Sequence, residues 1–583
     1  MAEESKLNPA EYAANEALNQ VIECINHGKS FVFEAGAGAG KTYSLIHVLR
    51  YLIQTQVRNL ARMNRKIACI TYTNVAKNEI KARTDGNPIV ISETIHSFCW
   101  AMIKDFQPNM RVILPGIGKW DERINKTSGI DNKLIRYDLG YPQIEEHTVW
   151  LGHDDVLSVM IELMKQSKFR TILFRRFPFI FIDEYQDTNK DFINAIKQYF
   201  IAMKEGPLIG LFGDHWQKIY GSNACGKAEH ANLTVIEKKA NFRSVKIIVE
   251  CLNQMRKELP QFVNNPNSEG SIIIYHSNNW QGERRTGGHW DGDLSADMAH
   301  HCLEMVKANL ISHQWDFSPE RTKILMLTHN VLAEEQGYRN LADVFTRTES
   351  YIKKEDDYIS YFVDVLEPVC NAFESHRYGE MFSILGGKTP ILRNYAEKMV
   401  WTKSMETLIS LRNTGTIGQI IDHLQITRRP RLPEKIERKE SNFSALINKS
   451  DADWSESDRK FVERFRALKK IAYAEVIALE KFIDNKTPFA TKHGVKGVEF
   501  ENVLVIIGRG WSQYNFGQML EWVGGGIPKG KQDAFERNRN LFYVACSRSK
   551  KRLALLFTQK LSTTAIEVIA GWFGSDTINA LDV

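Results

Sequence analysis

A chain of 583 residues exceeds what one hydrophobic core organises, so several domains are expected. With 43% hydrophobic residues, 25% charged residues and a net charge of +6, the composition is that of a globular protein, and the weak positive charge permits nucleic-acid binding without demonstrating it. The 8 cysteines form no C-x-x-C pair and no run of about 18 apolar residues occurs, which argues against a disulfide framework, a cysteine zinc site and a membrane span, and favours a cytoplasmic protein.

A glycine-rich turn follows the first predicted strand, the apolar run from Phe31 to Phe33. Apolar residues then recur at helical spacing from Tyr43 to Ile53, so a helix is expected to begin at the Lys-Thr pair before them. A strand, a glycine loop and a helix N-terminus in this order aim backbone N–H groups at an anion. The candidate phosphate-binding residues are Ala35, Gly36, Ala37, Gly38, Ala39, Gly40, Lys41 and Thr42.

The Gly-Lys-Thr end of this loop decides its interpretation. Lys41 is expected to reach the β- and γ-phosphates of a nucleotide, and Thr42 to hold Mg²⁺. The first glycine of the usual GxxxxGK[ST] pattern is replaced by Ala35. The alternative is a glycine-rich turn that binds nothing. The loop alone predicts a nucleotide triphosphatase, a class that includes kinases, transporters, AAA-type machines and helicases.

A second acidic segment, FIFIDEYQDT, begins at Phe179. Residues 179–182 are all apolar, as in a buried parallel strand, and Asp183 and Glu184 follow where that strand ends. Because ligands of open α/β sheets bind at the carboxyl ends of strands, Asp183 is expected to act on Mg²⁺ and Glu184 to polarise the attacking water. An acidic surface turn is the alternative, which the phosphate loop makes the weaker reading.

The DEYQDT segment resembles the DExQDT box of superfamily 1 helicases of the UvrD/Rep/PcrA type. By this resemblance, Gln20 is expected to read adenine. The segment from Ala68 resembles the family's TFTNKAA segment, which implies that Tyr72, Thr73 and Asn74 contact single-stranded DNA, with Tyr72 stacking on a base.

ETIHSF resembles the TxHS box, which implies DNA-backbone contacts from Thr94 and His96. A core aromatic at Tyr72 and a buried, hydrogen-bonded His96 are the structural alternatives.

The resemblance continues at GLFGDHWQKIYGS and KANFRS. Gln217 matches the residue that senses the γ-phosphate, Phe242 the ring that stacks on adenine, and Arg243 a donor to the γ-phosphate, for which the planar arginine fork is suited. The tryptophan and arginine that follow the tyrosine of this box in the family are here Ser222 and Asn223, after Tyr220, so a base-stacking platform is expected to be missing, with Trp216 or Tyr220 as the alternative stacking residue.

Two further boxes lie near the end of the chain. TKHGVKGVEF resembles TxHxxKGLE, which implies that His493 and Lys496 face DNA and that Glu499 meets the ribose of the nucleotide. RNLFYVACSR resembles RLxYVAxTR, which makes Arg548 a second arginine finger. The implied catalytic set is Lys41, Asp183, Glu184, Gln217, Arg243 and Arg548.

The resemblance implies an α/β fold of two RecA-like P-loop domains with parallel sheets. Each domain is expected to carry a mainly helical inserted subdomain. The expected boundaries are 1–99 and 171–245 for the first RecA-like domain, 100–170 for its insertion, 246–330 and 486–583 for the second, and 331–485 for the second insertion.

The leading functional hypothesis is an ATP- and Mg²⁺-dependent DNA helicase or translocase that moves 3′ to 5′ on single-stranded or tailed duplex DNA, as in DNA repair. The second is a DNA-sensing ATPase subunit that regulates a partner nuclease, because short proteins of this layout occur beside nucleases in anti-phage systems such as those of the Gabija B type. A degenerate scaffold is a third hypothesis, which the intact catalytic set disfavours. RNA as the substrate is disfavoured only by the resemblance to a DNA helicase family, because no residue of the sequence excludes it.

Overall fold

The computed structural model describes residues 8–127, 129–138, 142–203, 206–219, 221, 223–326, 329–386, 391–449, 454–491, 498–508 and 513–583. The chain divides into two compact units. The first comprises residues 1–273, 514–553 and 562–578, and the second comprises residues 274–513, 554–561 and 579–583. The divisions after residues 273, 553 and 578 fall within strands, so the six predicted domain ranges remain predictions.

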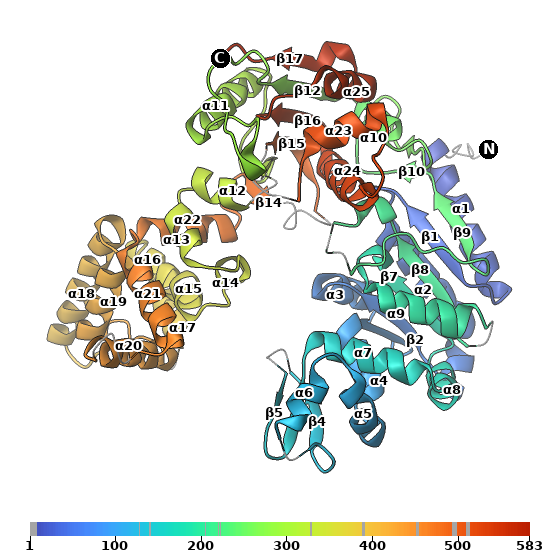
Figure 1. Ribbon diagram of the computed structural model, residues 1–583, viewed down its shortest axis with the longest axis horizontal. Helices are drawn as coiled ribbons and strands as arrows, with labels where there is room; N and C mark the ends of the chain where they lie inside the picture. The colour runs from blue at the N-terminus through green and yellow to red at the C-terminus, as the bar shows by residue number, and fades with distance from the viewer. Residues whose placement is uncertain are drawn as a thin grey trace. The chain divides into compact units, whose positions relative to one another are not determined.

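The first unit contains a six-stranded sheet in the order β3-β2-β7-β8-β1-β9, with every neighbouring pair parallel (Figure 1). Its strands are β1 (Phe31–Ala35), β2 (Ile67–Thr71), β3 (Val90–Thr94), β7 (Phe179–Asp183), β8 (Leu208–Gly213) and β9 (Thr234–Lys238). Its helices are α1 (Pro9–Asn26), α2 (Lys41–Arg62), α3 (Asn74–Arg83), α4 (Ile95–Ile103), α7 (His153–Met164), α8 (Ser167–Arg176), α9 (Lys190–Ile196) and α10 (Lys246–Met255).

Alternating side chains of β1 fill two hydrophobic cores, one on each face of this sheet. Phe31 and Phe33 pack with apolar residues of α1 and α2, whereas Val32 packs with those of α4, α7 and α9. Burial of β1 on both faces explains the apolar run from Phe31 to Phe33, and Glu34 is the polar exception in this strand. The carboxyl ends of β1, β7 and β8 therefore meet at one edge.

The segment between α4 and α7 holds short helices and a small sheet that the sequence did not predict. The sheet has the order β4-β6-β5, and its β5 strand is antiparallel to β6. The strands are β4 (Leu134–Tyr137), β5 (Gln143–Ile144) and β6 (Thr148–Leu151), and the helices are α5 (Gln107–Ile113) and α6 (Trp120–Asn125). Strands this short carry too few residues for a recognisable alternating pattern.

A second six-stranded sheet has the order β14-β13-β15-β16-β12-β17, in which β13 is parallel to β14 and β15. Its strands are β12 (Ser271–His276), β13 (Thr322–Met326), β14 (Phe489–Thr491), β15 (Phe500–Ile507), β16 (Ser549–Phe557) and β17 (Ile578–Ala580). A short parallel pair joins β10 (Ala240–Asn241) to β11 (Phe262–Val263). The associated helices are α11 (Ala296–Ser312), α23 (Phe516–Gly525), α24 (Gln532–Cys546) and α25 (Thr563–Phe573).

The insertion between β13 and β14 is helical in its described parts. Its helices are α12 (His329–Glu335), α13 (Arg339–Val344), α14 (Glu349–Ile352), α15 (Asp357–Tyr361), α16 (Glu367–Glu374), α17 (Tyr378–Leu385), α18 (Tyr395–Thr414), α19 (Ile417–Thr427), α20 (Glu434–Ile447), α21 (Glu456–Lys470) and α22 (Ala474–Ile483). Buried Arg412 ties α18 to α16 through Glu367, at 2.5 Å, and Glu374, at 2.9 Å.

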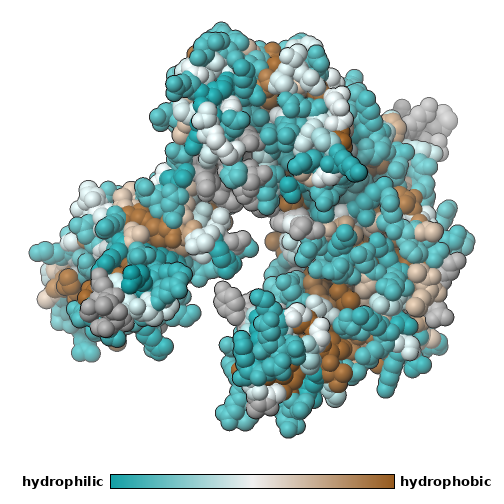
Figure 2. Space-filling model, in the orientation of Figure 1, coloured by the Kyte–Doolittle hydropathy of each residue, from teal (hydrophilic) through white to brown (hydrophobic). Residues whose placement is uncertain are grey.

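These elements confirm the predicted α/β class with parallel sheets and helical insertions. Figure 2 shows a face that is mainly hydrophilic, with hydrophobic side chains gathered in small patches. Within the described ranges, no helix combines the length and the apolar character that crossing a bilayer requires.

Candidate nucleotide-binding site

The glycine-rich turn links β1 to α2, as the sequence predicts. Gly38 and Gly40 have φ angles of +74° and +70°, in the left-handed region that favours glycine. A Cβ atom at Gly38 would lie 2.7 Å from the Asn241 side-chain oxygen, so a larger residue could not occupy this position without displacing its neighbour. The absence of a side chain at Gly38 therefore lets the Asn241 side chain approach the turn closely.

Asn241 fastens the phosphate loop to the NFRS turn. Its side-chain amide donates to the carbonyl of Ala37 at 3.0 Å, and its side-chain oxygen accepts from the backbone N–H of Arg243 at 2.9 Å. The backbone N–H of Phe242 also donates to the carbonyl of Gly38, at 2.9 Å. Residues 200 positions apart in the sequence thus form one rigid wall of the site.

Lys41 begins α2 and meets the acidic end of β7. Its ammonium donates to Glu184 at 2.9 Å, and the Lys41 side chain is only 9% exposed. Burial alone would lower the pKa of Lys41, but Glu184, Asp214 and Asp183 raise it above the ordinary value, so the ammonium stays charged. Buried Asp183 accepts from the backbone N–H of Glu184 at 3.1 Å. The phosphate loop and the acidic segment therefore share one site, with half-buried Thr42 beside Lys41.

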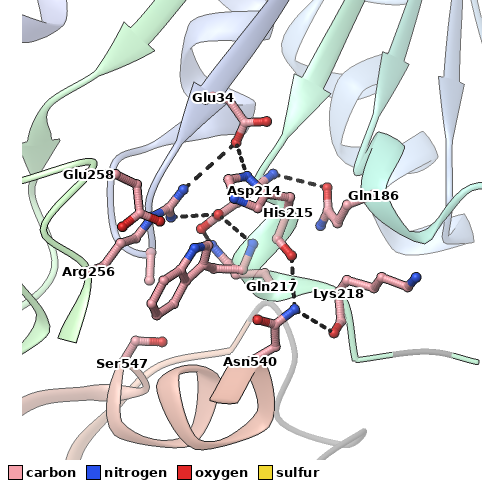
Figure 3. A network of polar contacts seen from close by, with 12 residues as sticks. Glu34, Gln186, Asp214, His215, Gln217, Lys218, Arg256, Glu258, Asn540 and Ser547 are labelled. Carbon is pink, nitrogen blue, oxygen red and sulfur yellow. Dashed lines mark hydrogen bonds and ion pairs between the residues drawn. The ribbon is translucent and has the colours of Figure 1, made fainter. Parts of the chain in front are cut away.

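A buried polar network lies behind this pair, at the end of β8 (Figure 3). Asp214 is fully buried and accepts from Gln217 at 2.7 Å and from Arg256 at 2.6 Å. Burial would raise the pKa of Asp214, but Arg256 and Lys41 lower it below the ordinary value, so the carboxylate is ionised at neutral pH. The network holds the predicted γ-phosphate sensor, Gln217, in a fixed position.

The sequence did not indicate Glu34 or Arg256 as members of this network. Glu34, on β1, lies 3.2 Å from the His215 ring and 3.9 Å from Arg256, and accepts from the hydroxyl of Tyr185. Glu34, Asp214 and His215 are close enough together to be considered as metal ligands. Because the guanidinium of Arg256 pairs with both carboxylates of this cluster, we interpret it as an ion-pair network rather than a metal centre.

The two arginines of the predicted catalytic set approach the same turn, at the end of α24. Arg243 donates to the carbonyl of Ser547 at 3.0 Å. Arg548 is 1% exposed and donates to the Ser547 hydroxyl at 3.2 Å and to Gln217 at 3.5 Å. Asn540, also on α24, donates to the carbonyl of His215 at 3.0 Å (Figure 3). Arg548 is thus brought to Gln217 within the first unit.

The residues predicted to contact the base and ribose are more dispersed. The ring of Phe242 is 42% exposed beside the phosphate loop, as a stacking surface requires. Gln20 is exposed in the middle of α1 and lines a cavity with Glu237, Lys239 and Phe262, none of which belongs to the phosphate loop. Glu499 is exposed just before β15, in the second unit.

The predicted DNA-contacting residues of the first unit lie at the ends of β2 and β3. Tyr72 is 39% exposed, so its ring is available to a base. Thr73 caps α3 by accepting from Ala76 at 3.2 Å, and Asn74 is the first residue of that helix. Thr94 is the N-terminal cap residue of α4, and its hydroxyl donates to Ser97 at 3.0 Å.

The ring of His96 stacks on that of His153, with 4.3 Å between centroids. Burial and the nearby His153 lower the pKa of His96 to about 4, so the ring is uncharged at neutral pH and could contact phosphate only as a neutral hydrogen-bond donor. His493 and Lys496, like Tyr220 and Ser222, lie outside the described residues.

The Arg256→Met variant should lower the stability of the first unit by about 3–5 kcal/mol, because it leaves buried Asp214 without its counter-charge. Urea unfolding followed by tryptophan fluorescence measures this loss. Lys257→Met changes an exposed neighbour and should have little effect. An Arg256→Met midpoint equal to that of the wild type would show that the ion pair does not stabilise the unit.

Two family models match parts of the chain. The family model described as an AAA domain matches residues 18–223, and that of the UvrD-like helicase C-terminal domain matches residues 324–560. The Gabija protein GajB of Bacillus cereus (strain HuB5-5) is 24% identical, over 95% of this chain and 96% of that protein.

Two further relatives are named as ATP-dependent DNA helicases. Rep of Buchnera aphidicola subsp. Schizaphis graminum is 22% identical, over 92% of each chain, and PcrA of Staphylococcus epidermidis (strain ATCC 35984) is 25% identical, over 42% of this chain and 40% of that protein. The helicase boxes predicted from the sequence occur in order along the same regions. Residues 324–560 thus match the UvrD-like helicase C-terminal domain, and the chain is similar to GajB and to Rep along more than nine-tenths of its length.

Proposed function

We propose that the chain is an ATP-dependent DNA helicase or translocase that moves 3′ to 5′ on single-stranded DNA. The observation that carries the proposal is the convergence of the predicted catalytic set. Lys41 pairs with Glu184 at 2.9 Å, Gln217 is held by buried Asp214, and Arg548 reaches Gln217. Hydrolysis of a γ-phosphate depends mainly on such positioned charges and donors.

The residues at the ends of β1 and β7 fit Mg²⁺ and a triphosphate. Mg²⁺ prefers oxygen ligands, and the Thr42 hydroxyl and Asp183 carboxylate are the oxygen groups that would hold it. When bound, Mg²⁺ would neutralise charge on the β- and γ-phosphates. A γ-phosphate would attract Lys41 away from Glu184, which leaves the Glu184 carboxylate able to accept a proton from the attacking water. Arg243 and Arg548 supply donors that cannot lose their charge.

A second function is favoured by the similarity to GajB along almost the whole of both chains. In this alternative the chain is a DNA-sensing ATPase subunit that regulates a partner nuclease in an anti-phage complex. The sequence departure at Ser222 and Asn223 agrees with it, because these residues replace the tryptophan and arginine that are expected to form a base-stacking platform in the helicases. ATP hydrolysis would then signal the presence of DNA to the partner nuclease instead of separating the DNA strands.

The test is ATP hydrolysis by the purified chain without DNA, with single-stranded DNA and with a 3′-tailed duplex, with strand separation measured in the same reactions. Hydrolysis stimulated by DNA together with separated strands supports the helicase. Stimulated hydrolysis with an intact duplex favours the sensing subunit. Hydrolysis that no DNA alters would contradict both functions.

The Tyr72→Ala variant should weaken single-stranded DNA binding by about 5- to 150-fold, because stacking on an aromatic ring contributes roughly 1–3 kcal/mol per base. Fluorescence anisotropy with a labelled oligonucleotide at fixed salt measures the affinity. Tyr12→Ala removes another exposed tyrosine, on α1, and should leave the affinity unchanged. Equal affinities of the Tyr72 variant and the wild type would remove Tyr72 from the DNA path.

A further inference from the structure

Lys238 is a buried cation next to the phosphate loop. It ends β9, which lies beside β1 at the edge of the first sheet, and it is the register partner of Ala35 (Figure 1). The residue is 2% exposed. Its ammonium donates to the hydroxyl of Ser44 at 2.9 Å and to the carbonyl of Gly40 at 3.4 Å. Lys238 therefore joins the end of β9 to the first turn of α2.

This position is electrostatically costly for a lysine. The N-terminus of a helix carries partial positive charge and favours anions, not cations. Among the described residues no carboxylate pairs with the Lys238 ammonium, and burial lowers the pKa of Lys238 to about 8. An apolar side chain would fill the end of a buried strand at less cost. Packing alone therefore does not explain why a lysine occupies this position.

The ring of Phe242 supplies that explanation. The Lys238 ammonium lies 5.5 Å from the centroid of the Phe242 ring, within the range of a cation–π contact. Phe242 is 42% exposed, and its backbone N–H donates to the carbonyl of Gly38 in the phosphate loop. The ammonium is thus held by α2 on one side and contacts an exposed aromatic ring on the other.

We propose that Lys238 is a positioning residue of the nucleotide site, whose ammonium fixes the Phe242 ring against the first turn of α2 so that the ring stacks on the purine base of ATP. The inference rests on the proposed ATP-binding function. The base and the phosphates of ATP are then recognised by different residues. Lys238 acts on the base through Phe242, whereas the loop and Lys41 hold the phosphates.

The test compares two ligands of Lys238→Met, a variant that keeps the length and the apolar stem of the side chain. Isothermal titration calorimetry with Mg²⁺ measures the affinity for ATP and for inorganic tripolyphosphate, which has no base. We expect ATP binding to weaken by about 5- to 10-fold, the size of a partly buried cation–π contact, while tripolyphosphate binding stays unchanged. Lys246→Met, at a 52% exposed side chain on α10, is the matched control and should bind both ligands normally.

A double variant separates positioning from general damage. Because Lys238 acts through the ring, Lys238→Met should have almost no further effect on ATP affinity once Phe242→Ala is present. Additive losses in the double variant, or equal weakening of both ligands, would overturn the inference while leaving the ATP site intact. Unchanged ATP affinity in Lys238→Met would overturn it as well. A wild-type chain that binds neither ligand would refute the ATP site itself.

Discussion

Replacing Arg548 with alanine should leave ATP bound but slow its hydrolysis by roughly 10³-fold or more, the contribution expected of an arginine finger. Arg548 is 1% exposed and reaches Gln217 at 3.5 Å, so its guanidinium lies where the predicted γ-phosphate sensor is held. Single-turnover hydrolysis measures the chemical step, and equilibrium binding of ATP measures the ground state. The loss should appear in the rate constant and not in the dissociation constant.

Two variants control this experiment. Arg548→Lys keeps the charge but loses the planar fork, and should remain strongly impaired. Lys551→Ala, at an exposed position on β16, should hydrolyse ATP at the wild-type rate. Because Arg548 also donates to the carbonyl of Val544 at 3.1 Å, thermal unfolding of each variant must show an intact fold. Near-normal hydrolysis in a folded Arg548→Ala chain would remove this residue from the finger role.

Replacing Lys41 with methionine should abolish measurable hydrolysis, a loss of about 10³-fold or more, because a positioned cation at the β- and γ-phosphates is removed. Methionine keeps the apolar stem that packs at this 9% exposed position. Steady-state turnover with saturating DNA is the measurement. The substitution also leaves Glu184 without its partner at 2.9 Å, so the folded state requires confirmation by circular dichroism.

The control for Lys41→Met is Lys29→Met, which changes an exposed lysine just before β1. That variant should turn over ATP like the wild type. Retained turnover in Lys41→Met would refute the phosphate-loop assignment and, with it, the ATPase function proposed for the chain.

The sequence predicted those parts of the site that depend on local order. Glycines at fixed positions between an apolar strand and a helix define the phosphate loop, and an apolar run followed by two acids defines the end of β7. Both features depend on neighbours in the chain, so a pattern can reveal them. The α/β class was implied by the resemblance of these motifs to the helicase family.

Other parts depend on contacts between distant residues, which no local pattern reports. Arg256 meets Asp214 across 42 positions, and Asn241 meets Ala37 across 204. A buried lysine such as Lys238 reads in the sequence as an ordinary exposed charge until its neighbours are known. The side chains that hold the predicted catalytic residues in place were missed for this reason.

Glu184 has a φ angle of 52°, a left-handed conformation that costs an L-residue about 1–2 kcal/mol. The contact of its carboxylate with Lys41 and the bond from its N–H to Asp183 help to offset that cost. Gln186 also donates to this carboxylate, at 2.5 Å, so a phosphate that attracts Lys41 removes one of its restraints. The backbone of Glu184 is then strained and less restrained, which makes this residue the point of the site best suited to change conformation between the empty and the occupied states.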